Sequence, residues 1–461
     1  MHQASPFGKI RVVVIICCLI LILGIFAYAY LIDKNDVILP KDEISDNVGS
    51  IEDSNYDFVS SYIKKYGVGN INAYKINQAQ TLLDSNYYKD LPPLKLWAEE
   101  AVKLFVADYY DNVNLDDKEA VTDAILTCLI RTIGDNWAYY RTASEFEDYS
   151  NSLEGGEEFV GIGIQINSTT REITMVYRDS GAEAAGIKPR DVLWAVEDKN
   201  ADEVTTDELL ALIKGEPGTT VKIAVKRQDV ILEFNVERRI LTERSVYYEM
   251  DEDKVGYIVI SQFLYDTVDQ FKEAIDFCVA NGAKALVIDV RYNPGGLLSS
   301  VVDIIDYITP DKEGRRIGSY TQSGREVVYY TDDGHGIDLP IAVICNEYTA
   351  SAGELFTAAM RDYGNEGVLD TVIVGTGTYG KGVAQNSYQF SDKSAITFTI
   401  GYFNPPCNVN FDGVGVTLDE EHTVPEIDTE DAPFNKAKEM VLELVELTKD
   451  QNTEITPGMA A

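Results

Sequence analysis

The stretch that decides the fold is Ile341-Ala342-Val343-Ile344-Cys345, followed after a short loop by Thr349-Ala350-Ser351-Ala352-Gly353-Glu354. Five consecutive apolar residues predict a buried β-strand, and the residues from about Ser351 to Tyr363 are expected to form a helix. A short apolar strand followed by a helix is the repeating unit of an α/β layer. Ser351 is therefore predicted to lie at a helix N-terminus, directly after a strand.

Other parts of the chain follow different patterns. Strands alternate with helices from residue 255 to 374, apart from a predicted hairpin at 314–330. Residues 56–150 have the periodicity of helices, and residues 157–240 that of short strands in one compact module. An amphipathic helix is expected at 432–448. The chain is therefore predicted to be an α/β protein of several domains.

Ser351 has two interpretations. Ser351 and Glu354 have the spacing of a capping box, in which a serine caps a helix and a glutamate reciprocates. The same position would suit a nucleophile, because a helix N-terminus offers free N–H groups and positive potential to a developing oxyanion. Both roles remain open from this segment alone.

Lys381 lies in the glycine-rich loop 375–382, where a solvent-exposed lysine is the simplest interpretation. Since His2, His335 and His422 are the only histidines, few candidates exist for a Ser-His-Asp triad, and a Ser-Lys pair remains open. A lysine that acts as a general base must be neutral near pH 7. This requires its pKa to fall by roughly 3 units, which corresponds to about 4 kcal/mol of free energy. Burial would supply that shift, and Gln385 could hold the neutral amine by a hydrogen bond.

Two further glycine-containing segments each have a structural and a functional interpretation. Asn293-Pro294-Gly295-Gly296 follows a buried strand and is either a tight turn or a turn whose backbone N–H faces a substrate carbonyl. Phe159-Val160-Gly161-Ile162-Gly163 is either a bulged strand or a backbone nest for a peptide carboxylate. A phosphate-binding loop is excluded at Lys381, because no Ser or Thr follows that lysine.

Residues 12–32 form an uncharged run that is long enough to span a bilayer as a helix. Lys9 and Arg11 precede the run, so the positive-inside rule leaves the N-terminus cytoplasmic and the remainder outside. A cleaved signal peptide with its site at Ala27-Tyr28-Ala29 is the alternative. A single-pass membrane anchor is the interpretation that we favour, with the catalytic part outside the cytoplasm at the cell membrane.

The charge and the cysteines exclude several classes of partner. A net charge of −37 argues against nucleic acid as a main ligand. The six cysteines show no CxxC or Cys/His spacing, so no metal site is predicted.

The order of these motifs resembles that of the C-terminal processing, or tail-specific, serine peptidases, from about residue 117 to 425. Gly134-Asp135 with Tyr139-Tyr140 resembles the family's segment before its PDZ domain. Residues 159–163 and 180–189 resemble that PDZ domain. Residues 293–296, 346–354 and 379–385 resemble the three catalytic motifs.

The resemblance implies a mostly β PDZ domain joined to a crotonase- or ClpP-like α/β catalytic domain, with no cofactor. It assigns the nucleophile to Ser351, the general base to Lys381 and the lysine-orienting group to Gln385. The oxyanion donors would be the backbone N–H groups of Gly295 or Gly296 and of Ala352. The PDZ domain would bind apolar C-terminal tails, and the residues that we assign to tail binding are Val160, Gly161, Ile162, Gly163 and Ile164.

Three departures from the family pattern are present, and none removes a catalytic residue. Arg190 replaces the usual glycine before the PDZ aspartate, which puts that turn in doubt. Tyr348-Thr349 stands where small residues are common. The segment after Asn404-Pro405-Pro406 is unlike the family, so the substrate wall there is expected to differ.

The sequence therefore predicts a membrane-anchored serine endopeptidase acting on proteins outside the cytoplasm. A non-catalytic PDZ module that binds protein tails and a crotonase-like enzyme acting on acyl-CoA are the alternatives. The terminal helices are candidates for a homodimer contact. The predicted parts are a cytoplasmic stub and anchor at 1–36, an acidic spacer at 37–55, a helical region at 56–155, the PDZ domain at 156–240, the catalytic domain at 241–428, and a C-terminal helix and disordered tail at 429–461.

Overall fold

The computed structural model describes residues 58–454 except 157, 167–169, 178, 189, 229, 243, 311–313, 323–324, 333 and 427–430. The apolar run at 12–32 and the spacer at 37–55 lie outside the described residues. Among the helices that are described, none combines the length and the apolar composition needed to cross a bilayer.

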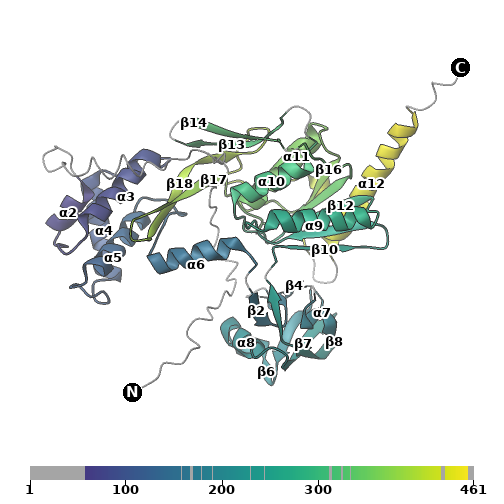
Figure 1. Cartoon of the computed structure of the whole chain (residues 1–461), viewed down its shortest axis with the longest axis horizontal. Helices are drawn as coiled ribbons and strands as arrows, with labels where there is room; N and C mark the ends of the chain where they lie inside the picture. Colours follow the sequence, from purple (N-terminus) through teal and green to yellow (C-terminus); the bar gives the residue numbers. More distant parts are fainter. Residues whose placement is uncertain are drawn as a thin grey trace.

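The first described part is a group of helices that packs against strands from the C-terminal half of the chain (Figure 1). Asp117 caps its last helix by accepting hydrogen bonds from the N–H groups of Glu119 and Ala120, both at 3.1 Å, as its sequence position predicts. Trp97 lies in the core and donates from Nε1 to the Leu129 carbonyl at 2.9 Å. The helices are α2 Val59–Lys65, α3 Ala73–Asn86, α4 Leu94–Asp108 and α5 Lys118–Arg131.

The next part is a small β-rich unit that has its own hydrophobic core and that Figure 1 shows below the remaining domains. Its largest sheet has the order β6-β5-β7-β8, while β2 pairs with β9 and β3 with β4. The helix α6 (Ala143–Glu154) leads into it. Its elements are β2 Glu158–Gly161, β3 Ile164–Ile166, β4 Ile173–Val176, α7 Gly181–Ala185, β5 Val192–Val196, β6 Lys199–Asn200, α8 Thr206–Ile213, β7 Thr220–Arg227, β8 Val230–Glu237 and β9 Arg239–Thr242.

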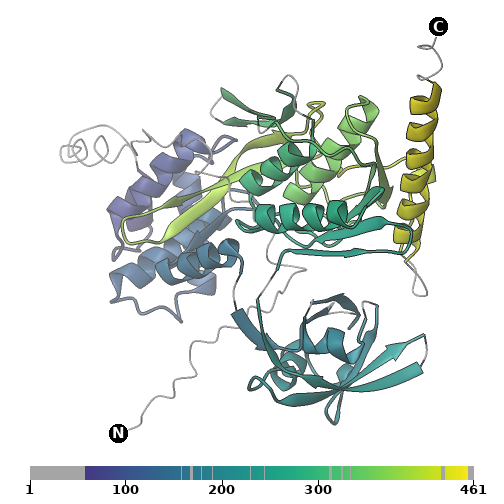
Figure 2. The ribbon, with the colours of Figure 1, turned by 45° about the vertical axis from the view of Figure 1, so that its right-hand side comes forward.

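The α/β part is built on a five-stranded sheet in the order β10-β11-β12-β15-β16, in which all pairs except β10–β11 are parallel. Helices α9 to α11 pack on one face and α12 packs on the other (Figure 2). The central strands β12 and β15 are therefore buried along their whole length, as expected for a parallel sheet. The elements are β10 Val246–Met250, β11 Val255–Ile260, α9 Thr267–Ala280, β12 Ala285–Asp289, α10 Leu298–Ile308, β15 Ile341–Cys345, α11 Ala352–Asn365, β16 Thr371–Gly375 and α12 Ala432–Glu454.

A second sheet joins the helical part to the α/β part. Its order is β1-β18-β13-β14, with β17 also paired to β18. The predicted hairpin is confirmed as β13 (Arg316–Gln322) and β14 (Arg325–Tyr330). Strand β1 (Tyr139–Arg141) follows α5, yet it pairs with β18 (Ala395–Asn404), and β17 spans Val383–Gln389. One hydrophobic core consequently runs through both parts, whereas the β-rich unit keeps its own.

Candidate active site

Ser351 occupies a strained turn between β15 and α11. Its φ of 54° and ψ of −115° lie in a region that non-glycine residues rarely occupy, at a cost of about 1–3 kcal/mol. The turn is fixed from both sides: Ala350 N–H donates to the Asn293 carbonyl, and Thr349 Oγ1 donates to the Val290 carbonyl, each at 2.8 Å. Thr349, which departs from the family pattern, is thus fully buried and helps to hold the turn in place.

Glu354 connects the Ser351 turn to the Lys381 loop. Its side chain is fully buried and accepts hydrogen bonds from the N–H groups of Ser351 at 2.8 Å and of Lys381 at 2.7 Å. It also accepts from Thr378 Oγ1 and from Gly380 N–H, both at 2.6 Å. Burial raises the pKa of the Glu354 carboxyl, while these hydrogen bonds lower it. The capping glutamate therefore has a second role, which the sequence did not indicate: it holds two distant segments together.

Lys381 is the buried amine of this site, since its side chain is only 1 % exposed. Burial lowers the pKa of Lys381 well below its ordinary value, although the negative charges of Asp135 and Glu354 oppose the shift. Nζ donates a hydrogen bond to Gln385 Oε1 at 2.8 Å. The structure thus brings together Lys381 and Gln385, and the lysine is not the solvent-exposed loop residue that the simplest interpretation predicted.

The glycine turn lies directly against Ser351. A Cβ on Gly295 would stand 2.7 Å from Ser351 Cβ, and one on Gly296 would stand 2.0 Å from the Phe263 carbonyl oxygen, so neither position accepts a side chain. The Gly295 N–H donates to Asn293 Oδ1 at 2.8 Å. This bond corrects one prediction, because that N–H is engaged and not available to a substrate. Gly296 and Ala352 stay as candidate oxyanion donors; Ala352 is the first residue of α11, where a helix N–H has no intrahelical acceptor.

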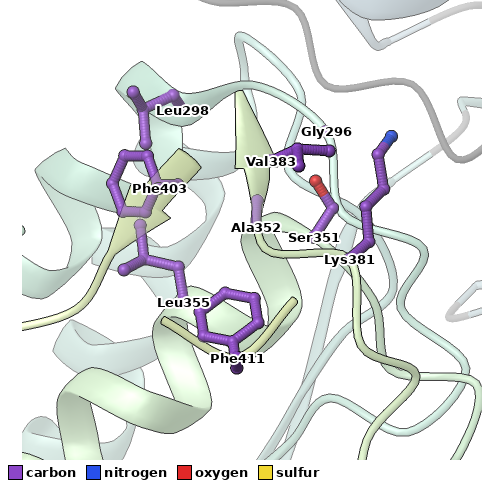
Figure 3. Close-up of a pocket in the computed structure, with 9 residues that line it drawn as sticks. All are labelled: Gly296, Leu298, Ser351, Ala352, Leu355, Lys381, Val383, Phe403 and Phe411. Atoms are coloured by element: carbon purple, nitrogen blue, oxygen red, sulfur yellow. The ribbon is translucent and has the colours of Figure 1, made fainter. Parts of the chain in front are cut away.

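A small, partly open cavity lies beside Ser351 (Figure 3). The Ser351 hydroxyl points toward Gly296, and the Lys381 side chain runs beside it and extends beyond the hydroxyl. The opposite wall is apolar and includes Phe403 and Phe411. Phe411 comes from the segment after Pro406, where a different substrate wall was expected. The full lining is Gly296, Leu298, Ser351, Ala352, Leu355, Lys381, Val383, Phe403 and Phe411.

The five residues assigned to tail binding lie where β2 ends and β3 begins. Strand β2 ends at Gly161 and β3 begins at Ile164, because Gly163 has a φ of 80° and turns the chain between them. The Ile162 side chain is buried in the core of the unit, and the Ile162 carbonyl accepts from Ala182 N–H at 2.9 Å. Val160 pairs with Ile240 in β9.

Arg190 keeps the turn that its substitution for glycine had put in doubt. Its φ is 73°, in the region that glycine normally occupies. Asp191 N–H donates to the Lys188 carbonyl at 3.2 Å, and Asp191 Oδ2 accepts from Lys188 N–H at 2.9 Å. The Arg190 side chain forms an ion pair with Asp431 at 3.2 Å, and Asp431 also pairs with Arg291 at 2.9 Å. Asp431 thereby links Arg190 of the β-rich unit to Arg291, which lies two residues before the turn at Asn293–Gly296.

Sequence reasoning missed Trp137. Its ring centroid lies 4.5 Å from Lys381 Nζ, and its carbonyl accepts a hydrogen bond from Gln385 Nε2. No spacing signal could have indicated this contact, since it joins segments 248 residues apart. In the part of the chain that the structure describes, no group of three or more His, Cys, Asp or Glu side chains could hold a metal ion.

Comparisons with known proteins agree with the domain order. A model of the PDZ domain matches residues 160–237, and a model of peptidase family S41 matches residues 254–422. The chain is 30% identical over 332 residues to a Staphylococcus haemolyticus protein named "Probable CtpA-like serine protease", covering 71% of this chain and 64% of that protein. It is 29% identical over 304 residues to the carboxy-terminal processing protease CtpA of Bacillus subtilis, covering 65% and 63%.

This chain thus spans less than two thirds of the length of each of these two relatives. A solved structure of a candidate S41 protease from Bacteroides fragilis NCTC 9343 aligns with a TM-score of 0.52 and 16% identity, covering 81% of this chain and 97% of that one. That likeness supports the fold. The resemblance to PDZ-containing C-terminal processing peptidases, which the sequence motifs indicate, is confirmed by the two family matches.

Proposed function

We propose that this chain, which matches a PDZ domain followed by a peptidase S41 domain and resembles the C-terminal processing peptidases, is a serine endopeptidase that cleaves protein substrates. The observation that supports this most is the placement of Ser351 and the buried Lys381 in the wall of one cavity. A lysine whose pKa is lowered by burial is a base of the kind that a serine nucleophile needs. No metal or cofactor is required for this chemistry.

In the proposed mechanism, Ser351 Oγ attacks the carbonyl carbon of the scissile peptide bond while neutral Lys381 accepts its proton. Gln385 Oε1 holds the lysine amine during this step. The oxyanion forms near the N–H groups of Gly296 and Ala352, where the N-terminus of α11 contributes positive potential. Protonated Lys381 then gives its proton to the leaving amine. Lys381 next accepts a proton from the water that attacks the acyl-enzyme and gives it to Ser351 Oγ as the ester bond breaks.

The PDZ domain is proposed to recognise the apolar C-terminal tails of substrates, with the backbone at residues 160–164 receiving the terminal carboxylate. A peptide ending in a free apolar C-terminus is therefore expected to be cleaved with a lower KM than the same peptide with an amidated C-terminus, roughly tenfold if one charge-assisted contact is lost. Steady-state kinetics on the matched pair measures this. Equal KM values with normal turnover would refute tail recognition while leaving the peptidase intact.

The cavity beside Ser351 is proposed to receive the side chain that precedes the scissile bond. Leu298, Leu355, Phe403 and Phe411 make its wall apolar, which favours an uncharged side chain, because a charged one would be desolvated without a partner. Phe411→Ala removes one ring and is expected to raise cleavage after aromatic residues, relative to cleavage after alanine, by about tenfold.

Mass-spectrometric mapping of cleavage sites in an unfolded protein measures this preference. Phe390→Ala serves as the matched control, because Phe390 is a buried ring that does not line the cavity. An unchanged cleavage pattern in Phe411→Ala would show that this cavity does not select the substrate side chain.

Membrane attachment is proposed from the uncharged run at residues 12–32, with the peptidase outside the cytoplasm. The proposal predicts that the full chain stays with membranes after an alkaline carbonate wash and is digested by protease added to intact cells. Recovery of the unprocessed chain in the washed supernatant would refute it.

A further inference from the structure

The loop between α5 and β1 reaches from the N-terminal helical part into the lysine site. Asp135 anchors it on β18, because Asp135 Oδ2 accepts from Thr399 N–H at 2.9 Å and Oδ1 accepts from Thr399 Oγ1 at 3.2 Å. The same carboxylate accepts from Trp137 N–H at 2.9 Å. The position of Trp137 is therefore fixed by β18, a strand of the second sheet that lies far away in the sequence.

Trp137 contacts both members of the lysine pair. Its indole lies over Lys381 Nζ, with the ring centroid 4.5 Å away, and packs edge-on against Tyr379 at 6.2 Å. Its carbonyl accepts from Gln385 Nε2. An amide that donates from Nε2 to Trp137 must present Oε1 on its other side, where Lys381 Nζ donates at 2.8 Å. A flipped amide would place Gln385 Oε1 against the Trp137 carbonyl oxygen, acceptor against acceptor, so the Trp137 carbonyl fixes the orientation of Gln385.

We propose that Trp137 is a positioning residue for peptide cleavage: its indole closes the lysine site against water, and its carbonyl orients Gln385 toward Lys381. This proposal rests on the proposed peptidase function. It also gives the N-terminal helical part a role in the reaction, because the peptidase domain match begins only at residue 254 and does not contain Trp137.

The indole has two opposite electrostatic effects on Lys381. Its face attracts a cation, which favours the protonated amine, and its bulk excludes water, which favours the neutral amine. Water solvates an ammonium group much better than an aromatic face does, so the exclusion of water dominates. The other charged and titratable groups around the lysine are Asp135 from the same loop, Glu354 from α11 and Tyr379 beside the indole, with Asp412 bound to the next N–H in the lysine loop. All of them remain when Trp137 is replaced.

The test compares Trp137→Ala and Trp137→Phe with the wild-type full chain in the pH dependence of kcat/KM. A base loses activity as it becomes protonated at low pH, so admitting water around Lys381 moves this acid limb to higher pH. Trp137→Ala is expected to shift the limb upward by about one pH unit, with roughly tenfold lower kcat near pH 7 and little change in KM. Trp137→Phe, which keeps an aromatic ring over the amine, is expected to stay close to wild type; the backbone carbonyl is retained in both variants.

The control is Trp97→Phe, which alters a buried tryptophan of the helical core and is expected to lower stability without moving the acid limb. The proposal would be overturned if the acid limb of kcat/KM in Trp137→Ala lay at the same pH as in wild type, or if Trp97→Phe shifted it equally.

A second readout does not depend on turnover. Reductive methylation of Lys381 by formaldehyde and cyanoborohydride, quantified on its peptide by mass spectrometry, reports the access of reagent to Nζ. Lys381 is expected to be labelled faster in Trp137→Ala than in wild type. Equal labelling would show that the indole does not shield Lys381, even if the variant is inactive. If Trp137→Ala is labelled faster but the wild-type protein cleaves no peptide, the proposed peptidase function is refuted, while the role of the indole in shielding Lys381 stands.

Discussion

Lys381→Met is expected to abolish peptide cleavage and, at neutral pH, to stabilise the fold. Loss of the general base should lower kcat by about 10⁴-fold or more, because the residues of such a unit act together. Burial of the amine lowers its pKa, so the folded state carries a penalty that methionine, of similar length, does not. The gain is offset in part because Gln385 Oε1 loses its donor. A net increase of about 2 kcal/mol in the free energy of unfolding is expected near pH 7.

The stability difference should also depend on pH in a definite direction. Between the lowered pKa of Lys381 in the folded state and about 10.4 in the unfolded state, the unfolded wild type binds more protons, so its stability rises with pH. The methionine variant lacks this dependence. The stability gain of Lys381→Met over wild type should therefore be largest below the lowered pKa of Lys381 and should shrink toward pH 10. Denaturant titrations of both proteins at pH 7 and at pH 10 measure this.

Lys75→Met is the matched control, because Lys75 is also buried but has two carboxylate partners, Asp123 at 2.9 Å and Asp392 at 2.7 Å. Burial alone would lower the pKa of Lys75, yet hydrogen bonds with Asp392, Tyr140 and Asp123 outweigh it and raise the pKa. Removing this amine leaves carboxylates unpaired and is expected to cost about 3 kcal/mol while sparing the catalytic site. Full activity of Lys381→Met, or destabilisation as large as that of Lys75→Met, would contradict the assignment of Lys381.

The parts of the fold that depend on local pattern could be predicted. The apolar strand at 341–345 and the helix that follows Ser351 are visible as periodicity, and the hairpin near residues 314–330 follows from β-forming residues. The pairing of Ser351 with Lys381 was expected only through resemblance to a family. Nothing in local sequence indicates that a lysine between glycines is 1 % exposed.

The parts that depend on long-range contacts could not be predicted. Glu354 has the spacing of a helix cap, and its bonds to the lysine loop require the tertiary fold. The Gly295 N–H is used by Asn293 within its own turn, a bond that family resemblance alone did not indicate. Trp137 contacts Lys381 and Gln385, and Gln385 lies on β17, which is joined to β1 only through β18 in the folded chain, so no window of sequence contains both partners.

Ser351→Ala is expected to remove cleavage while leaving the structure intact. Alanine lacks the attacking oxygen, and loss of the nucleophile in a comparable serine peptidase site lowers kcat by about 10⁶-fold. The backbone conformation at φ 54° is equally strained for both residues, so the change in stability should be small. Ser300→Ala is the matched control: Ser300 is buried in the same domain and donates to the Leu264 carbonyl at 2.6 Å. It should lose about 1 kcal/mol of stability and keep its activity.

The formation of new N-termini from unfolded casein, counted at equal concentrations of wild type and Ser351→Ala, tests the central assignment most directly. The account predicts that the wild type generates new N-termini steadily and that Ser351→Ala generates them no faster than buffer alone. Equal rates from the two proteins would show that Ser351 is not the nucleophile and would contradict the account.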